Sequence, residues 1–76
     1  MDKLIVIAGS GTYPRLVIQG AKAAGVKRVD ILAVKGSTDR ATCKIADSVH
    51  WISIGGIADG IRWMGSQGYD GAILAG

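Results

Sequence analysis

Glycine turns at the ends of apolar segments are the residues of this sequence best suited to chemistry. The first turn follows the apolar run LIVIAG and leads into a predicted helix, and a Gly-Gly pair follows a later apolar run. A glycine turn before a helix lets backbone N–H groups approach a phosphate, and the helix dipole adds to the attraction. A purely structural tight turn is the alternative. The predicted phosphate- or nucleotide-binding residues are Gly9, Ser10, Gly11, Thr12, Tyr13, Gly55 and Gly56.

The first turn departs from the dinucleotide-binding fingerprint G-x-G-x-x-G. Pro14 occupies the position of the third glycine, which normally lets the helix pack closely on its strand. The second apolar run ends at Lys35 rather than at an acid that could hold a ribose, and Asp30 lies too early in that run. These departures argue against bound NAD. Lys35 is compatible with a 2′-phosphate, so a fragment of an NADP-binding oxidoreductase stays open as an alternative.

Other reactive side chains are isolated in the sequence. His50 has no carboxylate at a matching spacing, which indicates a packed or edge histidine rather than a base. Ser10 lacks the flanking glycine spacing of a nucleophile elbow. Cys43 has no base near it and is expected in the core, and the aspartates form no metal-ligand cluster. We therefore predict no catalytic residue and no metal site in this chain.

Four short apolar runs predict the strands that would carry the glycine turns. They span residues 4–9, 29–34, 49–54 and 71–76, and glycine or polar residues flank each of them. The first and last runs have no polar alternation, so both should be buried on both faces. The third run alternates more, as a strand near a sheet edge does.

Helices are predicted between these strands. The first begins after Thr12, with Pro14 in its first turn, and ends at a left-handed Gly25. The last spans residues 57–67 and ends at Gly68, and a short helix lies within residues 37–48. The apolar stripes that should pack on the sheet are Val17, Ala21 and Ala24 in the first helix and Ile57, Ile61 and Met64 in the last.

Alternating strands and helices indicate an α/β fold with a parallel sheet and right-handed crossovers. We predict a Rossmann-like three-layer fold, with helices on both faces of a four-stranded sheet. The order 3-2-1-4 is favoured because the first and last runs are the most apolar, and 2-1-3-4 is the alternative. The last strand would leave an uncovered apolar edge, which proteins avoid. We therefore expect residues 1–76 to be one N-terminal domain of a longer two-domain protein.

Composition narrows the classes of function. The chain has 76 residues, one Cys and one His, so an internal disulfide and a Cys/His zinc cluster are excluded. Its net charge of +3 comes from scattered Lys and Arg, a pattern that does not predict nucleic-acid binding. Arg15, Lys35 and Arg40 should lie near the first turn, where an anion could use them or where they are plain surface charges. No signal or membrane-spanning segment is found, and the lone Cys fits the cytoplasm.

Several segments of the chain resemble a known family. IAGSGTYPRLV at residues 7–17, AKAAG, VHWISIGG, GIRWMGSQG and GAILAG occur in order along the whole chain. Together they resemble the N-terminal domain of the LpxI-type UDP-2,3-diacylglucosamine pyrophosphatases. The most specific element is I-A-G-x-G-x-x-P-x-x-V, followed by W-x-x-I-G. The family typically continues this Ile-Gly with a Gln-Leu-Gly-like segment, where this chain has Gly56, Ile57 and Ala58.

The resemblance implies a role in nucleotide-sugar pyrophosphate hydrolysis. The family cleaves UDP-2,3-diacylglucosamine to lipid X and UMP in lipid A biosynthesis, holds its substrate between two domains and uses a divalent metal, generally magnesium. Its catalytic and metal-binding acids lie in a C-terminal domain, so this chain would bind no metal and would not be active alone. The parent would be a cytoplasmic homo-oligomer that can associate with a membrane surface. A non-enzymatic binding module of the same fold is a further alternative.

Overall fold

Strands and helices alternate along the chain in the computed structural model, which describes residues 1–76. The strands are β1 (Lys3–Ala8), β2 (Arg28–Val34), β3 (Val49–Ile52) and β4 (Gly71–Ala75). The helices are α1 (Tyr13–Ala23), α2 (Arg40–Ile45) and α3 (Ile57–Gly65), and a 3-10 turn, η1 (Ile54–Gly56), precedes α3. All three strand pairs are parallel and the sheet order is β3-β2-β1-β4. The favoured order is therefore confirmed, and the alternative 2-1-3-4 is wrong.

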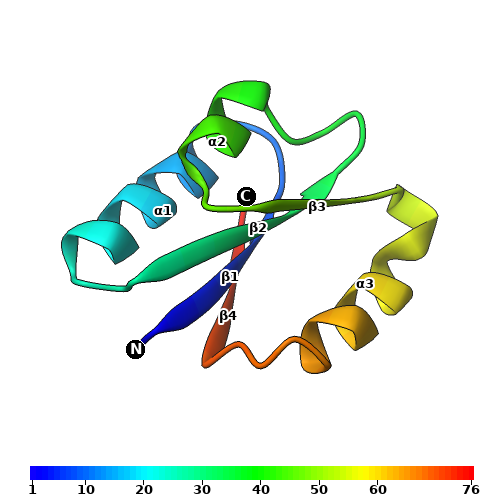
Figure 1. Ribbon diagram of the computed structural model, residues 1–76. Coiled ribbons are helices and arrows are strands. Elements are labelled where there is room, and N and C mark those ends of the chain that lie inside the picture. The colour runs from blue at the N-terminus through cyan, green and yellow to red at the C-terminus, as the bar shows by residue number, and fades with distance from the viewer.

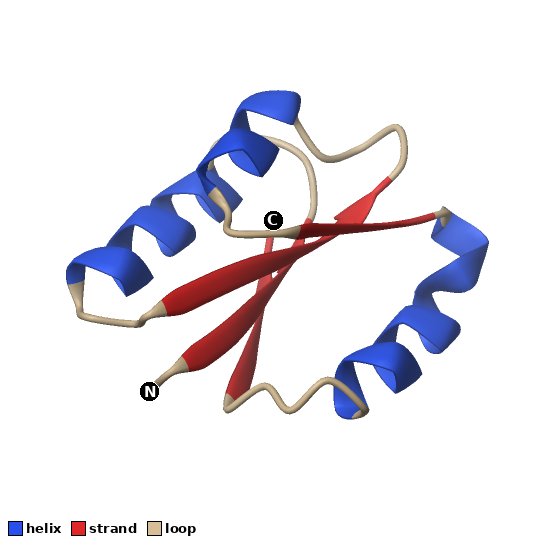
Figure 2. Ribbon diagram, in the orientation of Figure 1, coloured by secondary structure: helices blue, strands red, loops and turns tan.

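The helices form two layers around the sheet. Figure 1 shows α1 and α2 on one face and α3 on the other, and Figure 2 shows the sheet as the middle layer. This placement follows from right-handed crossovers, because the chain moves from β1 to β3 in one direction and then returns past β1 to reach β4. The carboxyl ends of all four strands consequently meet at one edge of the sheet.

The main core lies between the sheet and the layer of α1 and α2. Alternate residues of the strands point to this face, since successive side chains of a strand alternate. Val17 and Ala21 pack against this core as predicted, whereas Ala24 is exposed because α1 ends one residue before it. Ile18, which the predicted stripe leaves out, is fully buried. The buried members of this core are Val6, Ala8, Ile18, Val29, Ile31, Ala33 and Ala75.

Helix α3 contacts the opposite face through a glycine. A Cβ atom on Gly60 would lie 3.2 Å from Ile52 and 3.3 Å from Leu32, so the helix backbone rests directly on β2 and β3. Ile57 and Ile61 lie on the flank of α3 and are 41% and 52% exposed. The predicted stripe of Ile57, Ile61 and Met64 is therefore wrong in its first two members, because the helix turns Gly60 toward the sheet.

Strand β4 is covered on one face alone. Ala75 joins the core beneath α1, whereas Leu74, which points to the other face, is 77% exposed; Ile73 shares the face of Ala75 but is 38% exposed at the edge of the sheet. The prediction that the last strand is buried on both faces is wrong, because α3 lies over β2 and β3 and leaves β4 uncovered. β3 is the other edge strand, as predicted.

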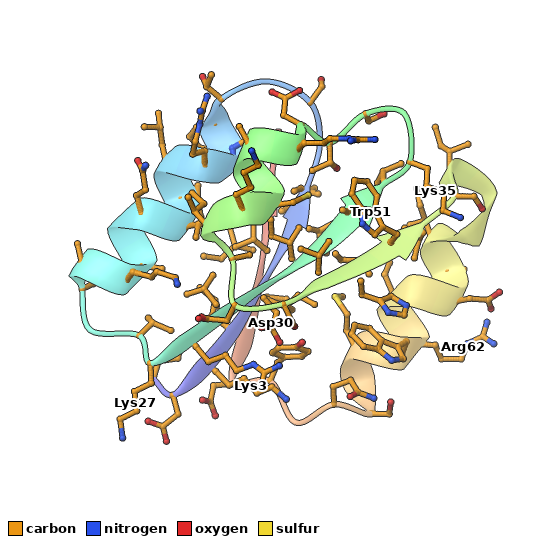
Figure 3. The ribbon with its side chains drawn as sticks, turned by 45° about the horizontal axis from the view of Figure 1, so that its top comes forward. Lys3, Lys27, Asp30, Lys35, Trp51 and Arg62 are labelled. Atoms are coloured by element: carbon orange, nitrogen blue, oxygen red, sulfur yellow. The ribbon has the colours of Figure 1, made fainter.

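A buried carboxylate stabilises the end of the sheet where the strands begin. Asp30 accepts hydrogen bonds from Arg28 Nε at 3.0 and 3.1 Å and from the Tyr69 hydroxyl, while Lys3 Nζ lies 4.5 Å from the centre of the Tyr69 ring. Figure 3 shows Asp30 and Lys3 at this end of the sheet. Burial alone would raise the pKa of Asp30, but hydrogen bonds from Arg28, Tyr69 and Ser48 outweigh it and lower the pKa. The cluster joins β2 to the segment that leads into β4.

Candidate phosphate-binding site

The turn after β1 presents a run of free backbone donors. Gly9 N–H donates to Ala75 O at 2.8 Å, but the N–H groups of residues 10–13 donate to no protein acceptor. Pro14, which has no N–H, is buried in the first turn of α1. Two of these donors, on Thr12 and Tyr13, lie at the N-terminus of the eleven-residue helix α1, a position that binds anions in other proteins, and the other two precede it in the turn.

Two glycines shape this turn for different reasons. Gly11 has φ +85°, a left-handed conformation, with open space where a Cβ atom would lie. Gly9 has no room for a side chain, because its Cβ would lie 2.5 Å from Gly76 O. The ends of β1 and β4 therefore pass backbone against backbone.

Thr12 occupies the residue before α1, as predicted, but its side chain makes no capping hydrogen bond. Its ψ of −14° is already helical, whereas a capping residue is usually extended. The Thr12 hydroxyl is therefore exposed together with Ser10 and Tyr13 beside the free N–H groups. This leaves several polar groups of the turn accessible to a ligand.

The predicted residues Gly55 and Gly56 lie apart from this turn. They belong to η1, which follows β3 and leads into α3 on the other face of the sheet. β2 separates β3 from β1, so the two glycine segments end strands two positions apart, about 10 Å. Neither glycine has a positive φ. Both segments share one edge of the sheet but do not contact each other, so a ligand using both would have to cross the end of β2.

Three cations line this edge without a carboxylate partner. Arg15 lies in the first turn of α1, Lys35 follows β2, and Arg40 begins α2. None of them forms a salt bridge, and the first turn of α1 contains no acid. Figure 3 shows Lys35 near the beginning of α3. The carboxylate of Asp39 lies at the same edge and also forms no salt bridge. Three cations and one carboxylate give this edge a net positive charge, which favours binding of an anion.

An apolar groove begins at the same glycine turn. It has a volume of about 300 Å³ and lies between α3 and the end of β4. Gly9 and Gly76 line it where β1 and β4 end, and Ile57, Ile61 and Leu74 are its exposed apolar side chains. The sequence did not reveal this groove, because it exists only where the flank of α3 faces the uncovered side of β4. Its lining residues are Ile7, Ala8, Gly9, Val34, Ile52, Ile57, Ile61, Leu74 and Gly76.

The remaining reactive side chains pack against other residues of the fold. The ring of His50 stacks on Trp63, with centroids 3.8 Å apart and planes 9° apart, which confirms it as a packed edge histidine. Cys43 is half-buried against the main core, and burial raises the pKa of its thiol. No group of three or more His, Cys, Asp or Glu side chains could hold a metal ion. Thr38, which the sequence did not single out, contacts the end of β1 through a hydrogen bond.

A parallel sheet of order 3-2-1-4, with helices on both faces and a glycine turn after its first strand, defines a Rossmann-like domain. Comparison with models of protein families identifies the family of this domain. The model of the LpxI N-terminal domain matches residues 3–76, and the chain belongs to that family. Comparisons with curated proteins and with solved structures give no match. None of the three helices has the length and apolar character needed to cross a membrane.

Proposed function

We propose that this chain is the N-terminal substrate-binding module of a UDP-2,3-diacylglucosamine pyrophosphatase. The full enzyme would hydrolyse the pyrophosphate of this nucleotide-sugar lipid to lipid X and UMP, in lipid A biosynthesis. This module would bind the phosphate groups through the turn at residues 9–13, with Gly55 and Gly56 at the far side of the same edge. The family membership and the free N–H groups of the turn support this assignment.

The observation that carries the proposal is that the donor turn and the apolar groove meet at Gly9. The N–H groups of residues 10–13 suit an anion, whereas the groove that begins at Gly9 and Gly76 is lined mostly by aliphatic side chains. A ligand that fits both surfaces carries a phosphate beside an apolar part. A nucleotide linked to a lipid has this composition, whereas NADP has no aliphatic part that would use the groove.

The chemistry of cleavage would come from outside this module. Magnesium prefers oxygen ligands from carboxylates, and the residues of this chain do not fit such a site because no cluster of acids forms. We therefore place the divalent metal and the catalytic acids in a C-terminal domain of the parent enzyme. The chain alone should release no UMP from the lipid substrate.

The setting of the parent enzyme is part of the same proposal. We place it in the cytoplasm, as a homo-oligomer that reaches its lipid substrate at a membrane surface. Its partner in catalysis would be its own C-terminal domain, and no nucleic acid would take part. The exposed Leu74 on β4 supports self-association, because exposed apolar edge strands pair readily.

Calorimetric titration of the folded domain with UMP, a UDP-sugar and NADP tests the proposal. We expect saturable binding of the uridine nucleotides and none of NADP. Binding of NADP without binding of uridine nucleotides would overturn the proposal in favour of an oxidoreductase fragment. Failure of all three to bind would remove the substrate-binding role.

A matched pair of glycine variants locates the site. Gly11→Ala and Gly25→Ala both place a side chain at a left-handed residue, with φ +85° and +95°, and both have open space for the Cβ atom. Each should cost about 1–2 kcal/mol of stability. Only Gly11→Ala should weaken UMP binding, by about tenfold or more, since Gly25 ends α1 at the opposite edge of the sheet. Equal affinities of the two variants would place the site elsewhere.

A further inference from the structure

A side chain bridges the end of the hydrogen-bond ladder between β1 and β2 at the candidate site. Arg28 N–H donates to Asp2 O at 2.9 Å, and a parallel ladder continues from there with even spacing. The same alternation would bring Val34 N–H to Ala8 O at the end of β1. At this point Thr38 Oγ1 accepts from Val34 N–H at 2.9 Å and donates to Ala8 O at 2.7 Å. The hydroxyl therefore links the last N–H of β2 to the last carbonyl of β1.

The loop that carries Thr38 is built to hold this hydroxyl in place. Val34 O accepts hydrogen bonds from Ser37 N–H at 3.0 Å and from Thr38 N–H at 3.1 Å, and Gly36 turns the loop with φ +83°. Lys35 N–H is bonded to Ile52 O at 2.8 Å, which ties the loop to β3 as well. Thr38 is only 8% exposed, and its hydrogen bond to Ala8 O is buried.

These bonds fix the peptide from which the glycine turn starts. The Ala8 carbonyl accepts from Thr38, and the N–H of the same peptide, on Gly9, donates to Ala75 O at 2.8 Å. The Ala8–Gly9 peptide is thus held from both sides, by the loop after β2 and by β4. The next N–H groups, at residues 10–13, are the free donors of the turn. The Ala8–Gly9 peptide is the last hydrogen-bonded peptide before these donors, so it fixes the point from which the turn starts.

We propose that Thr38 is a positioning residue of the phosphate site, a role that rests on the proposed function. By holding the Ala8–Gly9 peptide, its hydroxyl orients the free N–H groups toward the anion before the ligand arrives. Preorganised donors bind more tightly, because the ligand does not have to order them. Without the hydroxyl, Val34 N–H and Ala8 O would either lose their partners or bond directly. Direct bonding would close β1 on β2 and rotate the peptide that precedes the turn.

Three variants test this role by titration with UMP and with inorganic phosphate. Thr38→Val keeps the shape and removes the hydroxyl, and it should weaken both ligands by about tenfold or more. Thr38→Ser keeps the hydroxyl and should restore binding to within about threefold. Thr42→Val is the matched control, because Thr42 is also buried on α2 but its hydroxyl has no hydrogen-bond partner. It should leave affinity unchanged, and it should not lower stability because it removes a buried hydroxyl that has no partner.

Amide spectra separate positioning from a general loss of structure. In Thr38→Val, the ¹⁵N-amide signals of residues 9–12 should move, while those of α3 on the opposite face stay in place. If the valine variant does not fold, Thr38→Ala serves in its place. A folded variant without the hydroxyl that binds both ligands as the wild type does would overturn this inference. If the wild type itself binds neither ligand, the proposed function fails, and the positioning role fails with it.

Discussion

Replacing Gly60 by alanine tests how α3 is held on the sheet. In the middle of a helix, alanine is more favourable than glycine by about 1 kcal/mol. At Gly60 the new methyl group would lie 3.2–3.3 Å from the side chains of Ile52 and Leu32, which is closer than ordinary contact. Overpacking of this kind costs about 1–3 kcal/mol. We expect a net destabilisation of about 1 kcal/mol for Gly60→Ala, after the gain in helix propensity is subtracted.

Gly20→Ala in α1 is the matched substitution. Gly20 also lies inside a helix, but it is exposed and nothing lies within 4 Å of its Cβ position. It should therefore stabilise the domain by about 1 kcal/mol. The two variants would differ by about 2 kcal/mol in urea unfolding at 25 °C, and each kcal/mol would move the melting temperature of a domain this small by about 4–8 °C. If Gly60→Ala stabilises as much as Gly20→Ala, then α3 does not rest on β2 and β3 through its backbone.

Three further outcomes follow from titratable and exposed groups. Burial and the carboxylate of Asp30 raise the pKa of Tyr69. The contribution of Tyr69 to stability is therefore complete below about pH 10 and is lost as the pH rises further. In urea unfolding, Tyr69→Phe should lose less stability at alkaline pH than the wild type does. Because burial raises the pKa of Cys43, its reaction with a disulfide reagent at pH 8 should be about tenfold slower in the folded than in the urea-unfolded chain, and equal rates would refute its burial. Leu74→Lys should reduce any concentration-dependent association measured by sedimentation, since a charge on an exposed edge strand opposes pairing, and unchanged association would exclude β4 as the contact.

Local patterns in the sequence were sufficient to predict the order of the sheet. The apolar runs identify all four strands to within two residues, and the polar alternation of β3 places it at an edge. Left-handed glycines end α1 and follow α3 as predicted, with φ +95° at Gly25 and +72° at Gly68. The predicted end of α3 at residue 67 is two residues too late, because Ser66 and Gln67 N–H groups bond to carbonyls three residues earlier in a closing turn.

The sequence did not predict which faces of these elements are covered. An apolar strand such as β4 looks the same whether one helix or two pack on it, so the exposure of Leu74 could not be inferred from its own segment. Similarly, the isoleucines of α3 suggested a contact face, although the helix approaches the sheet through Gly60. Small residues allow two elements to pack more closely than large ones do. The spacing of apolar residues along a helix, however, reveals only the positions of the large side chains. Whether a face of a strand or helix is covered depends on which elements, distant in the sequence, pack across it.

The glycine turn itself shows why a short motif identifies a candidate site but does not complete it. Gly9, Ser10 and Gly11 determine that the chain can turn here and leave its N–H groups free. The Ala8–Gly9 peptide before the turn is held by two bonds from residues 30 and 66 positions further along the chain, in Thr38 and Ala75. Because both bonds come from residues distant in sequence, the G-x-G turn alone could not reveal them. The threonine after β2 and the glycine pair at the ends of β1 and β4 therefore belong to the candidate site that we propose, together with the turn.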